Sequence, residues 1–239
     1  MTKLYQKSRL WFALAWIAAY VIGTGAADGL SESLGVEKSI TLVYLAILTW
    51  IAVLWLRKNG LFQKYGLCRS ELPAGQLLFY IPLVAMVSCN LWFGVTVNLS
   101  PVETALYIGS MLLVGFLEEL IFRGFLFCAM AENDRRSAVV VSSLTFGIGH
   151  MVNLINGSGA QLLPNLCQVC YAVAAGFLFV TLFCKTKSLI PCILTHSALN
   201  ALSAFVPELT AGQQILSAAV LCVIPALYLW YLYRPNKGA

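Results

Sequence analysis

Charged residues are scarce in this sequence. Asp, Glu, Lys and Arg together make up 10% of the 239 residues, whereas 60% are hydrophobic; soluble domains average about 25% charged residues. A water-soluble globule of this size could not bury so much apolar surface, and the same composition excludes a disordered chain. The mean hydropathy of +0.82 shows that the apolar excess is general. We therefore predict an all-α, polytopic membrane protein that forms a single domain over residues 1–239.

Support for cysteine chemistry and for polyanion binding is also lacking. The eight cysteines lie within or beside apolar runs, where they behave as small hydrophobic residues. Cys167 and Cys170 form a lone C-x-x-C, and without a second such pair we expect neither a redox centre nor a structural metal site. The net charge of +5 comes from basic residues scattered between apolar runs, so we expect no nucleic-acid partner.

Long apolar runs are abundant instead. A helix needs about 20 apolar residues to cross the bilayer core. Eight such runs are present, at residues 10–27, 41–57, 76–97, 104–128, 137–155, 161–184, 188–206 and 213–233. The basic residues before the first run resemble the start of a signal peptide, but the run is long enough to anchor the chain. We therefore favour an uncleaved first span.

The distribution of Lys and Arg predicts the orientation. Thirteen of the fifteen lie in the two termini and in the second, fourth and sixth connections between runs, whereas the alternate connections hold Lys38 as their only basic residue. Cytoplasmic loops carry an excess of Lys and Arg. We predict eight transmembrane helices with both termini in the cytoplasm. The small size and the lack of targeting domains favour a prokaryotic plasma membrane.

Three ionisable residues interrupt the fourth apolar run. Glu118, Glu119 and Arg123 would each cost at least about 2.5 kcal/mol to insert at mid-membrane, so such residues usually face the protein interior and mark function. Glu119 and Arg123 are four residues apart and share a helix face, where they can pair. Glu118 points about 100° away and is left for chemistry or a ligand. The pair either supports that chemistry or only holds helices together.

Both histidines of the chain lie in apolar runs, beside residues on the same helix face. The two groups are Phe146, His150 and Asn153 in the fifth run, and His196 and Asn200 in the seventh. A helix bundle can bring them together with Glu118. Glu118, His150 and His196 match the ligand types of a catalytic zinc with water in the open position. Alternatively, Glu118 is a general base for water, and imidazole and amide donors stabilise an oxyanion without a metal.

The ordered motifs resemble those of a known family. Glu118-Glu119-x-x-x-Arg123, Phe146-x-x-x-His150 and His196-x-x-x-Asn200 follow one another on separate apolar segments. This triplet resembles the CPBP family, which comprises the type II CAAX prenyl proteases and the bacteriocin-processing intramembrane proteases, also called Abi. The motifs occupy residues 118–200, within a motif-bearing core at about 104–206.

The resemblance also implies roles for these residues. Glu118 and His150 would activate the hydrolytic water, while His196 and Asn200 would complete the site and stabilise the oxyanion. Glu119 and Arg123 would support the architecture. The family is labelled as metalloproteases, so zinc is the cofactor to expect if a metal is used.

The leading hypothesis is an intramembrane endopeptidase that cleaves a membrane-associated or prenylated peptide. His196 lies about 12 Å into its run at 1.5 Å per residue, which favours cytoplasmic access and cleavage near the cytoplasmic leaflet. Membrane lipid is the other expected partner. One alternative is a non-catalytic immunity or scaffold protein that binds a peptide through the same polar pocket. A proton-coupled transporter is disfavoured because the chain has no internal repeats.

Other intramembrane protease types are excluded by motifs that the sequence lacks. H-E-x-x-H is absent. Asp28 and Asp134 are the only aspartates, and both flank apolar runs, whereas an aspartyl protease needs two within the membrane. Gly157-Ser158-Gly159 lies in a connection and lacks the rhomboid pattern.

Overall fold

The computed structural model describes residues 1–72, 80–154 and 161–234. Within these ranges the chain is helical and has no strand, which confirms the all-α prediction. The elements are α1 (Thr2–Lys7), α2 (Arg9–Ser33), α3 (Ser39–Lys58), α4 (Ile81–Ser88), α5 (Pro101–Glu119), α6 (Cys128–Ala131), α7 (Arg135–Gly149), α8 (Leu162–Thr186), α9 (Ile190–Leu202) and α10 (Ala211–Tyr233). Three 3₁₀ segments (Cys89–Leu91, His150–Leu154 and Ser203–Phe205) and one π-helix (Leu120–Phe127) adjoin them. All eight cysteines are free thiols.

Six of the eight predicted runs coincide with helices long and apolar enough to cross a membrane. These are α2, α3, the continuous stretch Pro101–Ala131, the stretch Arg135–Leu154, α8 and α10. The seventh run contains α9, which with its 3₁₀ turn forms a shorter apolar helix, Ile190–Phe205. The structure therefore confirms several membrane-spanning helices.

The prediction for residues 76–97 is wrong at its C-terminal end. The helix with its 3₁₀ turn covers Ile81–Leu91, and the chain is irregular over residues 92–100. Gly94 has a φ of 102°, a left-handed value that glycine adopts without strain. The start of this run lies outside the described residues, as do Gly157-Ser158-Gly159 and Lys237.

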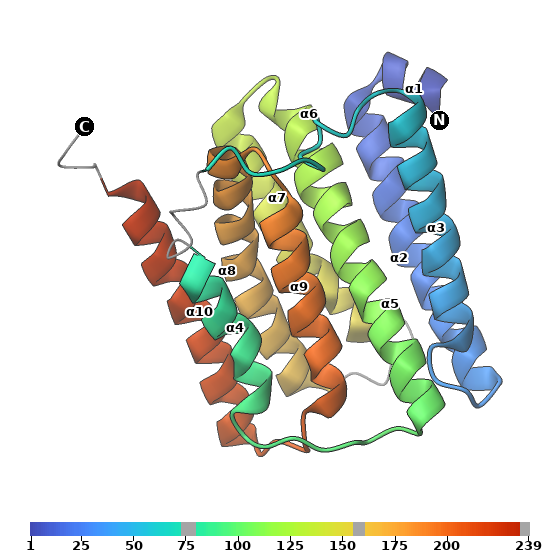
Figure 1. The fold of residues 1–239 in the computed structure, drawn as a ribbon, viewed down its shortest axis with the longest axis vertical. Coiled ribbons are helices and arrows are strands. Elements are labelled where there is room, and N and C mark those ends of the chain that lie inside the picture. Colours follow the sequence, from blue (N-terminus) through green and yellow to red (C-terminus); the bar gives the residue numbers. More distant parts are fainter. Residues whose placement is uncertain (73–79, 155–160, 235–239) are drawn as a thin grey trace.

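Small residues let the central helices approach closely. In Figure 1, α5 and α9 lie side by side, with α2 and α3 on one flank and α4 and α10 on the other. A Cβ added at Gly115 of α5 would lie 2.6 Å from the backbone nitrogen of Ser197 of α9. One added at Gly147 of α7 would lie 2.7 Å from the backbone nitrogen of Val173 of α8. Only glycine permits such backbone contact, which is typical of membrane helix pairs.

A π-helical segment directly follows the two glutamates of α5. All of its residues, Leu120–Phe127, are buried. Two of its carbonyls find donors outside the π-helical hydrogen-bond pattern: Ser142 Oγ donates to Phe122 O at 2.9 Å, and Cys128 Sγ to Arg123 O at 3.6 Å. π-Helices are rare and frequently occur at functional sites. The segment changes the register of side chains after Glu119, which residue spacing alone did not predict.

The connections gather at two opposite ends of the bundle. At one end Lys64 lies 3.0 Å from Tyr5 Oη and 4.0 Å from a carboxylate oxygen of Glu132, and Leu189 N donates to Gly66 O at 2.7 Å. This end joins the start of the chain to the α3–α4, α6–α7 and α8–α9 connections. We call it the basic end, because these segments carry most of the Lys and Arg residues. The last turn of α10 points toward the same end (Figure 1).

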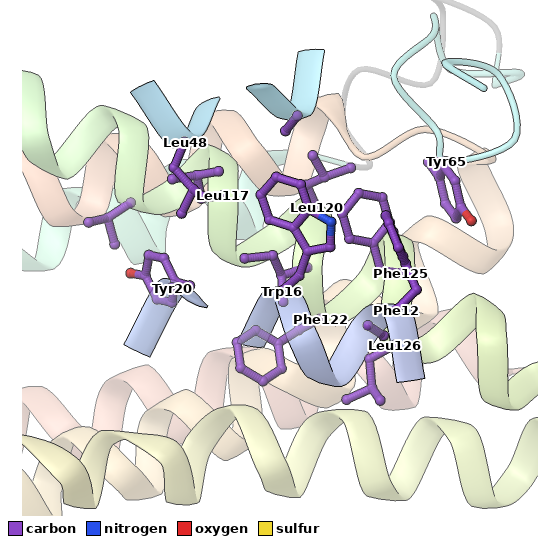
Figure 2. Close-up of a cluster of buried hydrophobic side chains, with 14 of the residues drawn as sticks. Phe12, Trp16, Tyr20, Leu48, Tyr65, Leu117, Leu120, Phe122, Phe125 and Leu126 are labelled. Carbon is purple, nitrogen blue, oxygen red and sulfur yellow. The ribbon is translucent and has the colours of Figure 1, made fainter. Parts of the chain in front are cut away.

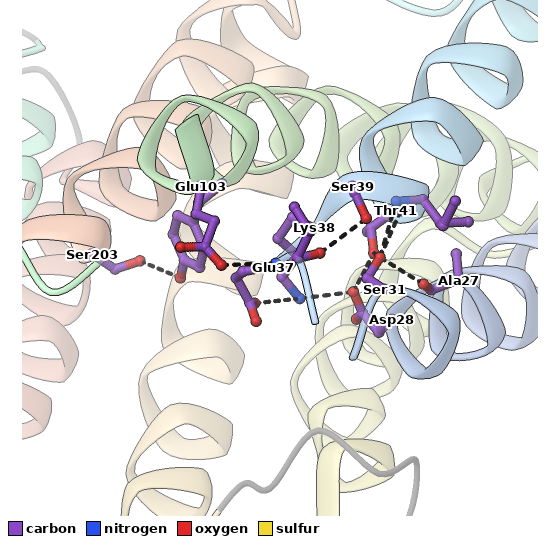
Figure 3. Close-up of polar contacts among 12 residues, drawn as sticks. Ala27, Asp28, Ser31, Glu37, Lys38, Ser39, Thr41, Glu103 and Ser203 are labelled. Carbon is purple, nitrogen blue, oxygen red and sulfur yellow. Dashed lines mark hydrogen bonds and ion pairs between the residues drawn. The ribbon is translucent and has the colours of Figure 1, made fainter. Parts of the chain in front are cut away.

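The other end carries mainly acidic side chains. Lys38 Nζ lies 2.8 Å from Asp28 Oδ1, and the backbone nitrogen of Glu37 donates to Glu103 Oε1 at 3.2 Å (Figure 3). Asn98 Nδ2 donates at 2.9 Å to a backbone carbonyl of the α9–α10 connection. We call this the acidic end. It joins the α2–α3, α4–α5 and α9–α10 connections.

Candidate active site

Glu119 and Arg123 form the buried ion pair that their spacing predicted. Arg123 Nη1 donates to Glu119 Oε1 at 3.1 Å, and both side chains are fully buried. The guanidinium also lies over the ring of Phe146, 3.9 Å from its centroid. A cation over an aromatic face is stabilised, and more strongly when water is excluded. This arrangement fixes the position of the helix that carries both glutamates.

Glu118 faces a different direction from Glu119, as the helical spacing predicted, but it is not free. Tyr20 of α2 donates its hydroxyl to Glu118 Oε1 at 2.7 Å. Glu118 Oε2 lies 3.4 Å from Nε2 of His196, within ion-pair distance although the contact does not meet hydrogen-bond geometry. The carboxylate is therefore held from two helices distant in the sequence.

His196 links the two glutamates. Its Nδ1 lies 2.8 Å from Glu119 Oε1, while its Nε2 faces Glu118. A carboxylate accepts hydrogen bonds, so the Nδ1 proton points at Glu119. When both ring nitrogens are protonated, the cluster of Glu118, Glu119, Arg123 and His196 has no net charge, which reduces the cost of burying it.

His150 lies at the end of α7, where a 3₁₀ turn begins. Its Nδ1 is 3.0 Å from the carbonyl oxygen of Phe146, and Asn165 Nδ2 donates to the carbonyl of His150 at 2.9 Å. Because a carbonyl can only accept, the Nδ1 carries the proton in this arrangement and Nε2 keeps a lone pair. The neutral ring can therefore accept a proton from a ligand or water at Nε2.

Phe146 contacts both histidines. Its ring centroid is 5.3 Å from that of His150 and 5.6 Å from that of His196, and both contacts are edge-to-face. This buried ring therefore contacts both imidazoles. The second motif thus contributes packing as well as a polar group.

A cavity of about 360 Å³ brings most of the expected residues together. Glu118, His150, Asn153 and Asn200 all line it, together with Tyr20. Asn153 also donates to Gln168 Oε1 at 3.4 Å. His196 does not line the cavity, but it contacts Glu118, which does. Glu118, His150 and Asn200 thus line one cavity, and His196 is linked to it through its contact with Glu118.

The expected zinc ligands are not gathered for metal binding. Over residues 1–72, 80–154 and 161–234, no three His, Cys, Asp or Glu side chains lie close enough to hold one ion. Glu118 and His196 face each other, while His150 faces the cavity with its Nδ1 on a backbone carbonyl. The residues in this arrangement do not fit the three-ligand zinc site.

Tyr20 is a site residue that sequence reasoning missed. It lies 98 positions before Glu118, outside all three motifs, in the predominantly apolar helix α2. A tyrosine in a membrane span is common at interfaces and gives little signal by itself. Only the packing of α2 against the π-helical segment that follows α5 shows that its hydroxyl reaches the carboxylate.

A larger cavity lies elsewhere and is not part of this site. It has about 840 Å³ between α4 and α9 and is almost wholly apolar. Val84 and Leu194 on its wall are about two-thirds exposed, so it is open to the lipid-facing surface. None of the residues expected to act in catalysis lines it.

Fold and site together define the class: a polytopic helical membrane protein with Glu118 and His150 on the wall of an internal cavity and with Glu119 and His196 buried beside it. Residues 100–202 match the family model of the type II CAAX prenyl endopeptidases, Rce1-like. The match confirms the resemblance to CPBP family proteases, and the matched range includes all three motifs. Neither the comparison with curated proteins nor that with solved structures finds a match.

Proposed function

We propose that the protein is an intramembrane endopeptidase whose substrate is a membrane-associated or lipid-modified peptide. The main support is that Glu118, His150 and Asn200, from three helices of the matched segment, line one cavity inside the bundle. Ionisable side chains so placed within a membrane usually serve function. The matched family is one of proteases, which favours hydrolysis over passive binding.

In the proposed reaction, Glu118 and His150 activate a water molecule. The water oxygen attacks the peptide carbonyl carbon, and its proton passes to the Glu118 carboxylate or to Nε2 of His150. The same group then returns the proton to the leaving nitrogen as the carbon–nitrogen bond breaks. The Nδ1 contact of His150 supports this role because it leaves Nε2 as the acceptor.

Asn200 and His196 have different roles in this proposal. The Asn200 amide lines the cavity and can donate to the oxyanion that develops on the carbonyl oxygen. His196 contacts both glutamates instead, so it acts as a positioning residue that orients Glu118. Glu119 and Arg123 hold His196 and the helix in place.

We further propose that the reaction needs no resident metal, since the expected ligands are not gathered around one point. The water is then activated by the side chains alone. Measured metal content of the purified protein would decide between this route and the zinc route.

The proposed topology has eight crossings with both termini in the cytoplasm of a prokaryotic plasma membrane. The separation of a basic from an acidic end supports it, because Lys and Arg concentrate on the cytoplasmic side. The two shorter apolar helices, Ile81–Leu91 and Ile190–Phe205, would complete the eight.

The test is cleavage of a defined peptide by purified protein in liposomes. A farnesylated CAAX peptide and its unprenylated form are the probes, and Glu118→Gln is compared with Glu208→Gln, an exposed carboxylate outside the site. We expect Glu118→Gln to reduce cleavage by about 10²–10⁴-fold, with Glu208→Gln unchanged. His150→Ala should show a comparable loss. Cleavage of either peptide at wild-type rate by Glu118→Gln would overturn the assignment.

A further inference from the structure

The cavity that contains Glu118 extends toward one end of the bundle only. On α2, its lining runs from Tyr20 through Thr24 to Asp28, and Lys38 follows in the next connection. Asp28 lies eight positions after Tyr20, which contacts Glu118, so at 1.5 Å per residue the level of Glu118 is about 12 Å from that of Asp28 along the helix. Along α9 and the 3₁₀ turn that follows it, the lining runs in the same direction, from Asn200 to Ser203. The polar path therefore leads from the candidate site to the acidic end.

The opposite direction is closed by packed side chains. Figure 2 shows Phe12, Trp16 and Phe125 packed together on the basic side of Tyr20. Phe125 lies 5.1 Å from Phe12, 5.7 Å from Trp16 and 5.0 Å from Tyr65 between ring centroids. Each of these four rings is at most 4% exposed. Among the described residues, this buried cluster fills the space on the basic side of Tyr20.

The acidic end of the cavity is polar and reaches solvent. The paired side chains of Asp28 and Lys38 keep 20% and 16% of their surface exposed. Tyr107 Oη lies 2.9 Å from Ser203 Oγ on the opposite wall, near the loop contacts of Figure 3. All four residues line the cavity, so its mouth is made of hydrogen-bonding groups suited to a peptide backbone.

We propose that the substrate reaches Glu118 from the acidic end, which by the charge distribution faces away from the cytoplasm. The substrate is then a peptide segment presented on the extracytoplasmic side. An extended chain covers about 3.3 Å per residue, so about four residues would bridge the mouth and the scissile bond. That the entering molecule is a substrate rests on the proposed function, whereas the path to Glu118 does not depend on it. It departs from the cytoplasmic access that the depth of His196 favoured.

The test is labelling of single introduced cysteines with a membrane-impermeant maleimide. Thr24→Cys and Gln168→Cys place thiols on two walls of the cavity, on α2 and α8. Ser33→Cys and Lys58→Cys, both at exposed positions, report the acidic and the basic end. Intact cells and inside-out vesicles are labelled separately, and each introduced thiol is located by tandem mass spectrometry, which distinguishes position 168 from the neighbouring native Cys167 and Cys170.

We expect positions 24 and 168 to react from the same side as position 33, in intact cells, while position 58 reacts only in inside-out vesicles. Labelling of position 24 or 168 from the side of position 58 would overturn the path. The path would also be overturned if positions 24 and 168 do not react in a preparation where position 33 does. Reaction of position 58 in intact cells would overturn the extracytoplasmic assignment.

Labelling does not depend on proteolysis, so its outcome is independent of the cleavage assay. If the path is confirmed and Glu118→Gln still cleaves, the proposed function fails while the path stands. As a second readout, maleimide attached at Thr24→Cys should block cleavage by at least about 10-fold when added from outside. Unchanged cleavage after complete labelling would show that substrate takes another path.

Discussion

Nδ1 of His196 lies 2.8 Å from Oε1 of Glu119, although 77 residues separate them in the chain. The contact joins α9 to the end of α5 and places the other ring nitrogen against Glu118. His196 is thereby fixed between two carboxylates in a buried setting. This relationship explains why the third motif contributes to the site without lining the cavity.

Removing the hydroxyl of Tyr20 should impair catalysis without unfolding the protein. Tyr20→Phe keeps the buried ring but removes the hydrogen bond to Glu118, which as a bond to a charged group contributes about 1.5–3 kcal/mol. We expect kcat to fall by about 10–100-fold with KM nearly unchanged. Tyr44→Phe is the matched control, because its hydroxyl bonds only a backbone carbonyl of α2. Equal effects of the two variants would contradict a specific role of Tyr20.

The Glu119–Arg123 pair should show strong energetic coupling. Glu119→Gln or Arg123→Met alone leaves the other charge buried without its partner, and such a loss costs about 3–5 kcal/mol. The double variant removes both charges, so we expect it to cost clearly less than the sum of the two single variants. Unfolding by SDS titration in mixed micelles measures all three free energies. Additive losses would show that the pair is not coupled.

Close packing at Gly115 should control the distance between α5 and α9. A Cβ there would lie 2.6 Å from Ser197 N and 2.7 Å from Ser197 Cα, both backbone atoms that cannot rotate away. We expect Gly115→Ala to cost about 1–3 kcal/mol and to reduce cleavage, because the helices carrying Glu118 and His196 must separate. Gly29→Ala is the control, since a Cβ there meets nothing within 4 Å. Wild-type stability and activity of Gly115→Ala would refute this packing.

Chelation should not abolish cleavage if the side chains alone activate the water. The purified protein should hold much less than one zinc ion per chain, and prolonged treatment with EDTA should leave the cleavage rate within about two-fold. Elemental analysis and the peptide assay measure these two quantities on the same sample. Loss of activity that added zinc restores would instead support the metal route.

Much of the fold and part of the site could be predicted from local sequence features. Composition is sufficient to indicate a membrane protein, and the i,i+4 spacing of Glu119 and Arg123 is sufficient to indicate their pairing. The extent of the third apolar run was predicted less well, because apolar residues after Leu91 do not form a helix. Hydrophobicity shows where a chain prefers lipid or protein interior, but not where a helix ends.

The sequence by itself determined the membrane class, the positions of most helices and the identity of the ionisable groups, because these depend on residue type and short-range spacing. Tertiary structure decided that Tyr20 holds Glu118, that His196 lies behind the cavity, and that the cavity leads to the acidic end. Helices that face lipid are apolar all round, so periodicity does not show which face contacts which neighbour. Those contacts arise only when distant helices pack together.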